Sequence, residues 1–209
     1  MGEEPQAEFP QNQVAQSPVP RIVLAISTIL SSWLLMQIIH ETGHAVAALF
    51  TGGSIRRIVL VPWELSRTDL ILNPSPLIVC WAGPLVGTLL PILVWIIARI
   101  RRWRAEFWIR FLAGFCLIAN GTYIGIGAWT LDGDAGDLLR SGSSSWHLIS
   151  FGVTTAPAGL IMWHGLGPDF GIGRRAQLIN WNTALRSLLL LAAIIAAEIV
   201  CWLPLEFEL

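Results

Sequence analysis

The sequence predicts an all-α membrane protein, a bundle of about five transmembrane helices with a small β-hairpin after the first span. Of the 209 residues, 54% are hydrophobic and only 13% are charged, and the mean hydropathy of +0.63 is far above that of an ordinary soluble domain. Eleven Trp and eight Phe against one Tyr suit aromatic rings at a membrane interface. In lipid each apolar run must be a helix, because no water is present to satisfy an open backbone.

We expect a disordered tail over residues 1–20, followed by one polytopic membrane domain over residues 21–209. The tail holds four Pro and three Glu, so it cannot bury enough apolar surface to fold. Neither the basic start nor the early apolar run of a cleaved signal peptide precedes Arg21. The first hydrophobic helix is therefore expected to remain in the mature protein.

The spans are predicted from the length of each apolar run, because about twenty residues at 1.5 Å per residue cross the hydrocarbon. They cover residues 22–50, 76–100, 107–129, 146–165 and 184–203. The first three belong to a core over residues 22–140, and the last two are additional spans without recognisable chemistry. Between the first two spans, residues 51–73 contain two β-rich runs, RIVLV and DLIL, separated by a polar segment. This pattern predicts a small hairpin at the membrane surface.

Orientation is predicted from the arginines, which are the only basic residues because the chain has no lysine. Two connections are rich in arginine and should be cytoplasmic. These arginines are Arg99, Arg101, Arg102, Arg104 and Arg110 in the second connection and Arg174, Arg175 and Arg186 in the fourth. The amino-terminal tail then lies on the cytoplasmic side, and the end of the first span lies on the opposite side. A net charge of −1 argues against a nucleic acid partner.

Polar residues stand inside the first span, where they mark function more often than packing. His40, Glu41 and His44 form the pattern H-E-x-x-H, and Gln37 extends the same polar stripe. Positions four apart share one face of a helix, so both imidazoles can reach one ion, with Glu41 beside the open coordination position. A structural polar cluster is the plain alternative, but each unpaired group would cost several kcal/mol in lipid. We therefore expect a bound zinc ion, whose water Glu41 can deprotonate.

A third ligand is expected from the far end of the third span. Asp132, Asp134 and Asp137 lie there within six residues. Two crossings separate this end from the end of the first span, so both lie on the same side of the membrane. A solvated loop or a calcium site is the alternative, but the later Gly and Glu of an EF-hand loop are missing. Beside H-E-x-x-H, one of the three aspartates is expected to bind the metal.

Several motifs together resemble the site-2 protease family of membrane-embedded zinc metalloproteases, in its short form without a PDZ domain. They are HETGHAVAALFTGG, the hairpin after it, WAGPLVGTLL, Asn120 and LDGDAGDLL, within roughly residues 30–140. The resemblance implies a zinc metalloendopeptidase that hydrolyses peptide bonds in or near transmembrane segments of membrane proteins, by zinc-activated water with Glu41 as general base. Carried over, His40 and His44 are zinc ligands and Asn120 contacts the substrate.

The family's N-x-x-P-x-P-x-L-D-G pattern has lost its prolines here, and its spacing from Asn120 is longer. Literal matching of L-D-G selects Asp132 as the third ligand. Matching the apolar residues that follow the motif selects Asp134, which we prefer, with Asp137 and Asp132 behind it. The family commonly holds zinc near the cytoplasmic face, whereas the arginines place this site near the opposite face, so the orientation stays open.

Two other functions are alternatives to a protease. A catalytically inactive membrane binding or regulatory protein could retain the metalloprotease fold, but the intact Glu41 argues against it. A metal transporter would carry polar residues along several spans. The expected partners are thus a membrane protein or peptide substrate and the lipid bilayer.

Small residues predict close helix packing around the site. Gly83 and Gly87 form G-x-x-x-G in the second span, and Gly121 and Gly125 form another in the third. The remaining residues able to bind a metal are expected to serve packing or to lie at the interface. They are His147, His164, Cys80, Cys116 and Cys201.

Overall fold

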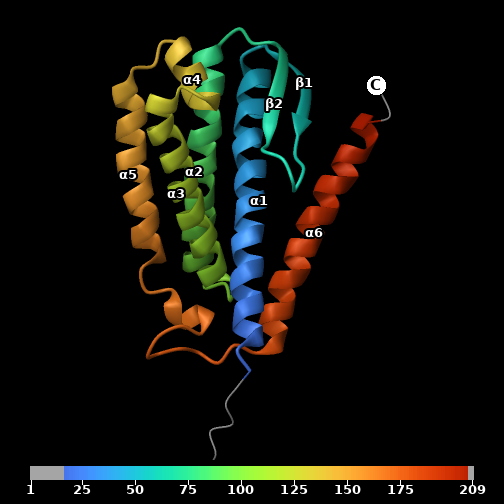
Figure 1. The fold of residues 1–209 in the computed structure, drawn as a ribbon, viewed down its shortest axis with the longest axis vertical. Coiled ribbons are helices and arrows are strands. Elements are labelled where there is room, and N and C mark those ends of the chain that lie inside the picture. Colours follow the sequence, from blue (N-terminus) through green and yellow to red (C-terminus); the bar gives the residue numbers. More distant parts are fainter. Residues whose placement is uncertain (1–16, 207–209) are drawn as a thin grey trace, which may run out of the picture.

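The computed structural model describes residues 17–206, which form six α-helices, one 3-10 helix and one two-stranded sheet (Figure 1). In chain order the elements are α1 (Val19–Phe50), β1 (Ser54–Val59), β2 (Arg67–Leu72), α2 (Pro76–Ile100), α3 (Glu106–Thr130), α4 (Gly133–Arg140), α5 (Ser145–Trp163), the 3-10 helix η1 (Gly167–Phe170) and α6 (Trp181–Glu206). The predicted tail lies outside the described residues up to residue 16, and α1 already begins at Val19.

Four helices are long and apolar enough to cross a membrane, namely α1, α2, α3 and the Trp181–Cys201 part of α6. They coincide with four of the five predicted spans, so the chain is a multi-pass integral membrane protein. The fifth predicted span, residues 146–165, folds as the 19-residue helix α5. It is not among the four because its Ser, His, Thr and Pro residues make it less apolar than they are.

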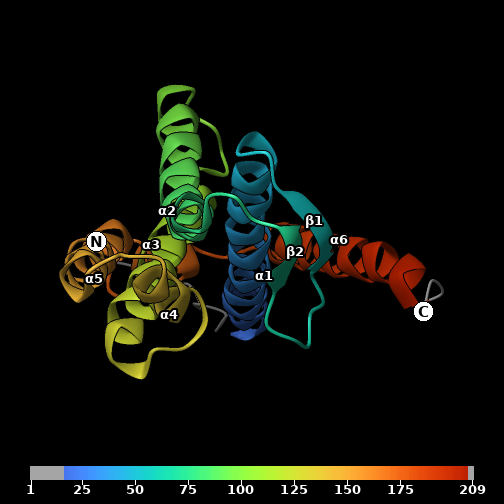
Figure 2. The ribbon, with the colours of Figure 1, turned by 90° about the horizontal axis from the view of Figure 1, so that it is seen from above.

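The helices form a row rather than a closed ring. Seen from above (Figure 2), α5 packs on α3, α3 on α2, α2 on α1, and α1 on α6. α3 and α5 approach each other closely, because a Cβ on Gly125 would lie only 3.0 Å from the Cα of Gly152. The predicted Gly121 and Gly125 pair therefore does allow two helix backbones to meet. α1, which carries H-E-x-x-H, lies between α2 and α6.

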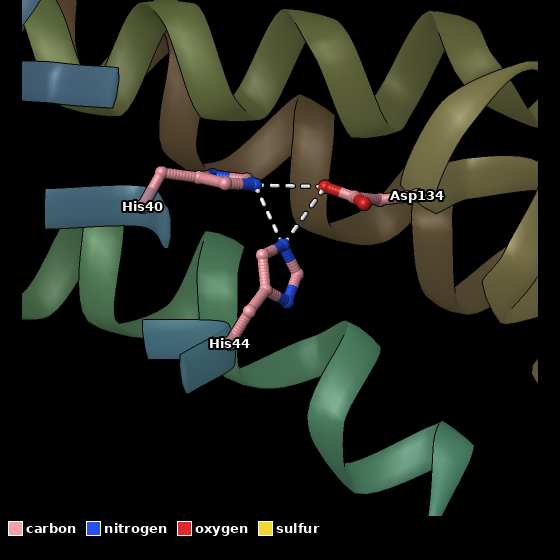
Figure 3. Close-up of side chains that lie close together, drawn as sticks. All are labelled: His40, His44 and Asp134. Carbon is pink, nitrogen blue, oxygen red and sulfur yellow. Dashed lines mark hydrogen bonds and ion pairs between the residues drawn. The ribbon is translucent and has the colours of Figure 1, made fainter. Parts of the chain in front are cut away.

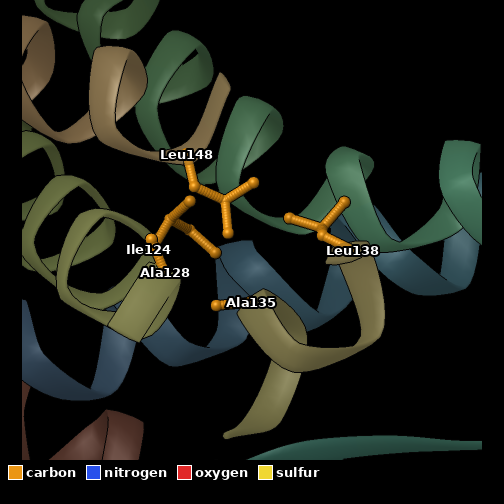
Figure 4. Close-up of a cluster of buried hydrophobic side chains, with 5 residues drawn as sticks. All are labelled: Ile124, Ala128, Ala135, Leu138 and Leu148. Atoms are coloured by element: carbon orange, nitrogen blue, oxygen red, sulfur yellow. The ribbon is translucent and has the colours of Figure 1, made fainter. Parts of the chain in front are cut away.

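The short helix α4 is held against α3 and α5 by an apolar cluster (Figure 4). Its buried side chains are Ile124, Ala128, Ala135, Leu138 and Leu148. The chain reaches α4 through two residues of positive φ, Leu131 at 62° and Gly133 at 54°. This turn folds α4 back over the end of α3, where it also contacts α2.

The hairpin forms as predicted, with β1 and β2 antiparallel and Val59 paired with Arg67 next to the turn. Its position at the membrane surface stays a prediction, and what the structure shows is its packing against α1. The hairpin runs back along α1 (Figure 1), and the backbone N–H of Ser66 donates to Oε1 of Gln37 at 2.9 Å. Gln37 lies about 20 Å from the end of α1 at 1.5 Å per residue. The buried polar groups of α1 need partners, and the hairpin supplies them.

Candidate functional site

Three side chains from two helices meet at one point (Figure 3). His40 and His44 come from α1 and Asp134 comes from α4. Oδ2 of Asp134 lies 2.7 Å from Nε2 of His40 and 3.2 Å from Nε2 of His44, and the two Nε2 atoms lie 3.0 Å apart. Both histidines are buried. The spacing of four residues thus places both imidazoles on one face of α1, as predicted.

The orientation of each imidazole is fixed by a hydrogen bond on its other nitrogen. The amide nitrogen of Asn120 donates to the Cys116 carbonyl at 2.9 Å. Its Oδ1 therefore faces Nδ1 of His40 at 2.6 Å and accepts a hydrogen bond from the Nδ1–H. Nδ1 of His44 lies 2.8 Å from the Val79 carbonyl, which can only accept. In a neutral imidazole the opposite nitrogen then carries a lone pair. Both Nε2 atoms therefore present lone pairs to the Asp134 carboxylate.

Three lone-pair atoms within 3.2 Å of one another repel unless a cation lies among them. Zinc ligands at about 2.0–2.2 Å and tetrahedral angles stand about 3.3–3.5 Å apart, so small shifts would complete such a site. Two imidazoles and one carboxylate, each imidazole held by an outer hydrogen bond, are a ligand set of catalytic zinc. The residues fit zinc.

A proton can take the place of the metal cation. Burial raises the pKa of the Asp134 carboxyl, but hydrogen bonds and charge interactions with His40 and His44 together lower it below its ordinary value, and these interactions require a proton on Nε2. Asp134 therefore stays ionised and needs a positive partner, either a proton on an imidazole or a metal ion. Metal binding at this site displaces that proton.

Of the three predicted aspartates, only Asp134 lies against the imidazoles. Asp132 is exposed at the N-terminal cap of α4. Asp137 is exposed and pairs with Arg140 at 2.6 Å. The amphipathic turn of α4 separates them, because Ala135 and Leu138 point into the apolar cluster while Asp134 faces α1.

Glu41 is buried next to His40 and its carboxylate faces the hairpin. Ser66 Oγ donates to one carboxylate oxygen at 2.8 Å, and Thr68 Oγ1 donates to the other at 2.7 Å. Sequence reasoning did not find these two hydroxyls. They lie 25 and 27 residues away, and no local pattern marks them as partners of a helix residue.

Asn120, predicted as a substrate contact, is 1% exposed. Its oxygen is used by His40 and its amide nitrogen by Cys116. The structure therefore places Asn120 behind His40, with both polar atoms of its amide in hydrogen bonds. Tyr123, which the sequence did not single out, also lies here: its hydroxyl accepts from the Asp134 backbone N–H at 3.1 Å.

Three glycines leave room for these side chains. A Cβ on Gly83 would overlap the His44 ring, and one on Gly87 would lie 2.9 Å from both polar atoms of the Asn120 amide. A Cβ on Gly133 would overlap the Tyr123 hydroxyl. The predicted G-x-x-x-G of the second span thus admits site residues, in addition to the close α1 and α2 contact at Gly43.

The remaining histidines and the cysteines lie apart from the three ligands. His147 contacts the Ser144 hydroxyl at 3.2 Å at the start of α5, and the carbonyl of His164 accepts from Arg110 at 2.7 Å at its end. All three cysteines, within residues 17–206, are free thiols.

A protein-family model described as Peptidase M50B-like matches residues 20–124 of the chain. The matched region spans H-E-x-x-H, the hairpin, α2 and Asn120, and ends before Asp134. Comparison with curated proteins gave no match, and neither did comparison with solved structures.

Proposed function

The chain belongs to the M50B-like peptidases, which are integral-membrane zinc peptidases of the site-2 protease family, and from this we propose that it hydrolyses peptide bonds in or near transmembrane segments of membrane proteins. One observation carries the proposal. Asp134, 90 residues from His44 along the chain, completes a three-ligand group with the two imidazoles of α1. That group adjoins a buried carboxylate suited to act as a base.

Each residue has a role in the proposed reaction. His40, His44 and Asp134 hold the zinc ion, and Asn120 and the Val79 carbonyl orient the two imidazoles. When bound, zinc polarises a carbonyl and lowers the pKa of water towards 7. Glu41 accepts the proton of the attacking water and returns it to the leaving amine.

A helical substrate resists this attack, because its carbonyls are held in hydrogen bonds to residues four positions on. It must therefore be unwound near the site. We propose that a free edge of the hairpin holds the unwound segment by adding it as a third strand. The contact between the hairpin and the proposed base supports this, because Thr68 of β2 donates a hydrogen bond to Glu41.

The test is Glu41→Gln, which keeps the size of the side chain and removes its basicity. The probe is a panel of fluorescently labelled single-span helices of Leu and Ala with a central Gly-Pro, reconstituted with the purified protein. We expect cleavage to fall at least about 100-fold, with zinc content close to that of the wild type. Glu64→Gln, an exposed glutamate in the hairpin turn, is the matched control and should cleave normally.

Cleavage by Glu41→Gln at the wild-type rate would remove Glu41 from the reaction. Wild-type protein that binds zinc and cleaves no helix of the panel would favour the inactive membrane regulator with the same fold.

A further inference from the structure

Ser66, the residue before β2, and Thr68 of β2 attach the hairpin to one turn of α1 by hydrogen bonds. Ser66 and Thr68 donate to the two oxygens of Glu41 at 2.8 and 2.7 Å, and the backbone N–H of Ser66 donates to Gln37 at 2.9 Å. Positions two apart in an extended strand face the same side, so both hydroxyls reach the same carboxylate. Gln37 and Glu41 are four residues apart and share a face of α1. The hydrogen-bond donors of Ser66 and Thr68 therefore face the acceptors of Gln37 and Glu41 across the contact between the hairpin and α1.

The hydroxyls of Ser66 and Thr68 supply hydrogen-bond donors to the buried carboxylate of Glu41. Glu41 is 4% exposed within an apolar helix, and a buried carboxylate without donors is strongly unfavourable. One donor on each oxygen fixes both the position and the plane of the carboxylate. A carboxylate has about four lone-pair sites, so two sites remain to accept a proton. The hydroxyls therefore hold the base without blocking it.

We propose that Ser66 and Thr68 are positioning residues, which set the Glu41 carboxylate for proton transfer and tie it to the hairpin. The inference rests on the proposed role of Glu41 as general base. Its consequence is that the strand lying next to a bound substrate also sets the base. A misplacement of about 1 Å in a catalytic group can lower a rate about 100-fold.

The activity test compares Ser66→Ala, Thr68→Val and their double variant with the conservative Ser66→Thr and Thr68→Ser. On the panel helix that the wild type cleaves fastest, each single loss should lower kcat about 3-fold to 10-fold and the double loss about 100-fold. KM should change less than about twofold, and zinc content should stay at the wild-type level. The conservative variants should retain most activity. Ser54→Ala, which removes a hairpin hydroxyl from β1, is the matched control.

A second measurement does not depend on activity. Thr68→Val should lower the thermal unfolding midpoint by about 2–4 °C in the wild type, and by much less in a Glu41→Leu background, where the acceptor is already absent. Equal losses in both backgrounds would show that the hydroxyl does not bind Glu41 and would overturn the inference.

The outcomes separate the two proposals. A double variant that cleaves at the wild-type rate, or faster, while Glu41→Gln is inactive refutes positioning and leaves the general base intact. Cleavage by Glu41→Gln itself refutes the proposed function, on which the positioning role depends.

Discussion

Gly83→Ala tests whether α2 shapes the metal site. Gly83 lies opposite His44, and a Cβ at this position would stand 2.5 and 2.8 Å from Cε1 and Cδ2 of the imidazole. Ordinary contacts between carbon atoms are about 3.5–4.0 Å. The ring or the helix must therefore move by about 1 Å. The ring of His44 has little freedom to move, because its Nδ1 is hydrogen-bonded to the carbonyl of Val79, which lies on α2 like Gly83.

The expected effect follows from the tolerance of metal ligation. Ligand distances are held within about 0.2 Å, so a shift of about 1 Å removes His44 as a ligand or separates α1 from α2. Loss of an outer partner already weakens metal binding 10-fold to 100-fold. Loss of the ligand itself should exceed that, so we expect zinc affinity to fall at least about 100-fold, or about 2.8 kcal/mol.

The assay is zinc content of the purified protein across a series of chelator-buffered zinc concentrations, with the thermal unfolding midpoint recorded alongside. Gly159→Ala is the matched control, since its Cβ would stand 2.5 Å from the Gly114 carbonyl in the interface of α3 and α5. It should lower the midpoint and leave zinc affinity unchanged. Zinc affinity of Gly83→Ala equal to that of the wild type would refute the role of this glycine and the placement of His44.

Three further predictions concern the ligands and their supports. Asp134→Asn should lose zinc while Asp132→Asn and Asp137→Asn retain it, as measured by metal analysis; retention by Asp134→Asn would exclude it as the ligand. Asn120→Leu should weaken zinc binding 10-fold to 100-fold because His40 loses its orienting partner, whereas a substrate contact would alter KM alone. Gly133→Ala should lose zinc because its Cβ meets the Tyr123 hydroxyl, and adding Tyr123→Phe to this variant should restore part of the zinc binding. A double variant that binds no more zinc than Gly133→Ala would show that the positive φ of Gly133, and not the overlap with Tyr123, causes the loss.

Features set by short stretches of sequence could be predicted. The length and apolarity of a run are properties of the run itself, which is why four spans and the hairpin appear where expected. The two histidines of H-E-x-x-H share a helix face for the same reason. α5 differs from this pattern. It is long enough to cross a membrane, but its polar residues leave it outside the four helices that are apolar enough to do so.

Features set by packing between distant segments could be predicted only in part. The choice of Asp134 depends on the turn at Leu131 and Gly133, which decides the face of α4 that meets α1. The preference for Asp134 came from a family pattern and not from this geometry. The spacing of Gly83 and Gly87 predicted a close contact. No local feature of the sequence indicated that the groups in contact would be the imidazole of one residue and the amide of another.

The hairpin shows the limit most clearly. Its strands are evident from the two β-rich runs, RIVLV and DLIL, yet its place along α1 depends on which buried groups it satisfies. Gln37 and Glu41 are visible as polar residues in an apolar helix, and their partners Ser66 and Thr68 are ordinary turn and strand residues. A search for donors able to serve those two side chains is the signal that could have placed the hairpin beside α1.

X-ray absorption at the zinc edge, with metal content measured on the same purified wild-type sample, tests the central claim most directly. We predict one zinc per chain with nitrogen and oxygen ligands at about 2.0–2.2 Å, including two imidazoles, and loss of the imidazole signal in His40→Ala. Protein without stoichiometric zinc, or zinc with a sulfur ligand at about 2.3 Å, would contradict a site built from His40, His44 and Asp134.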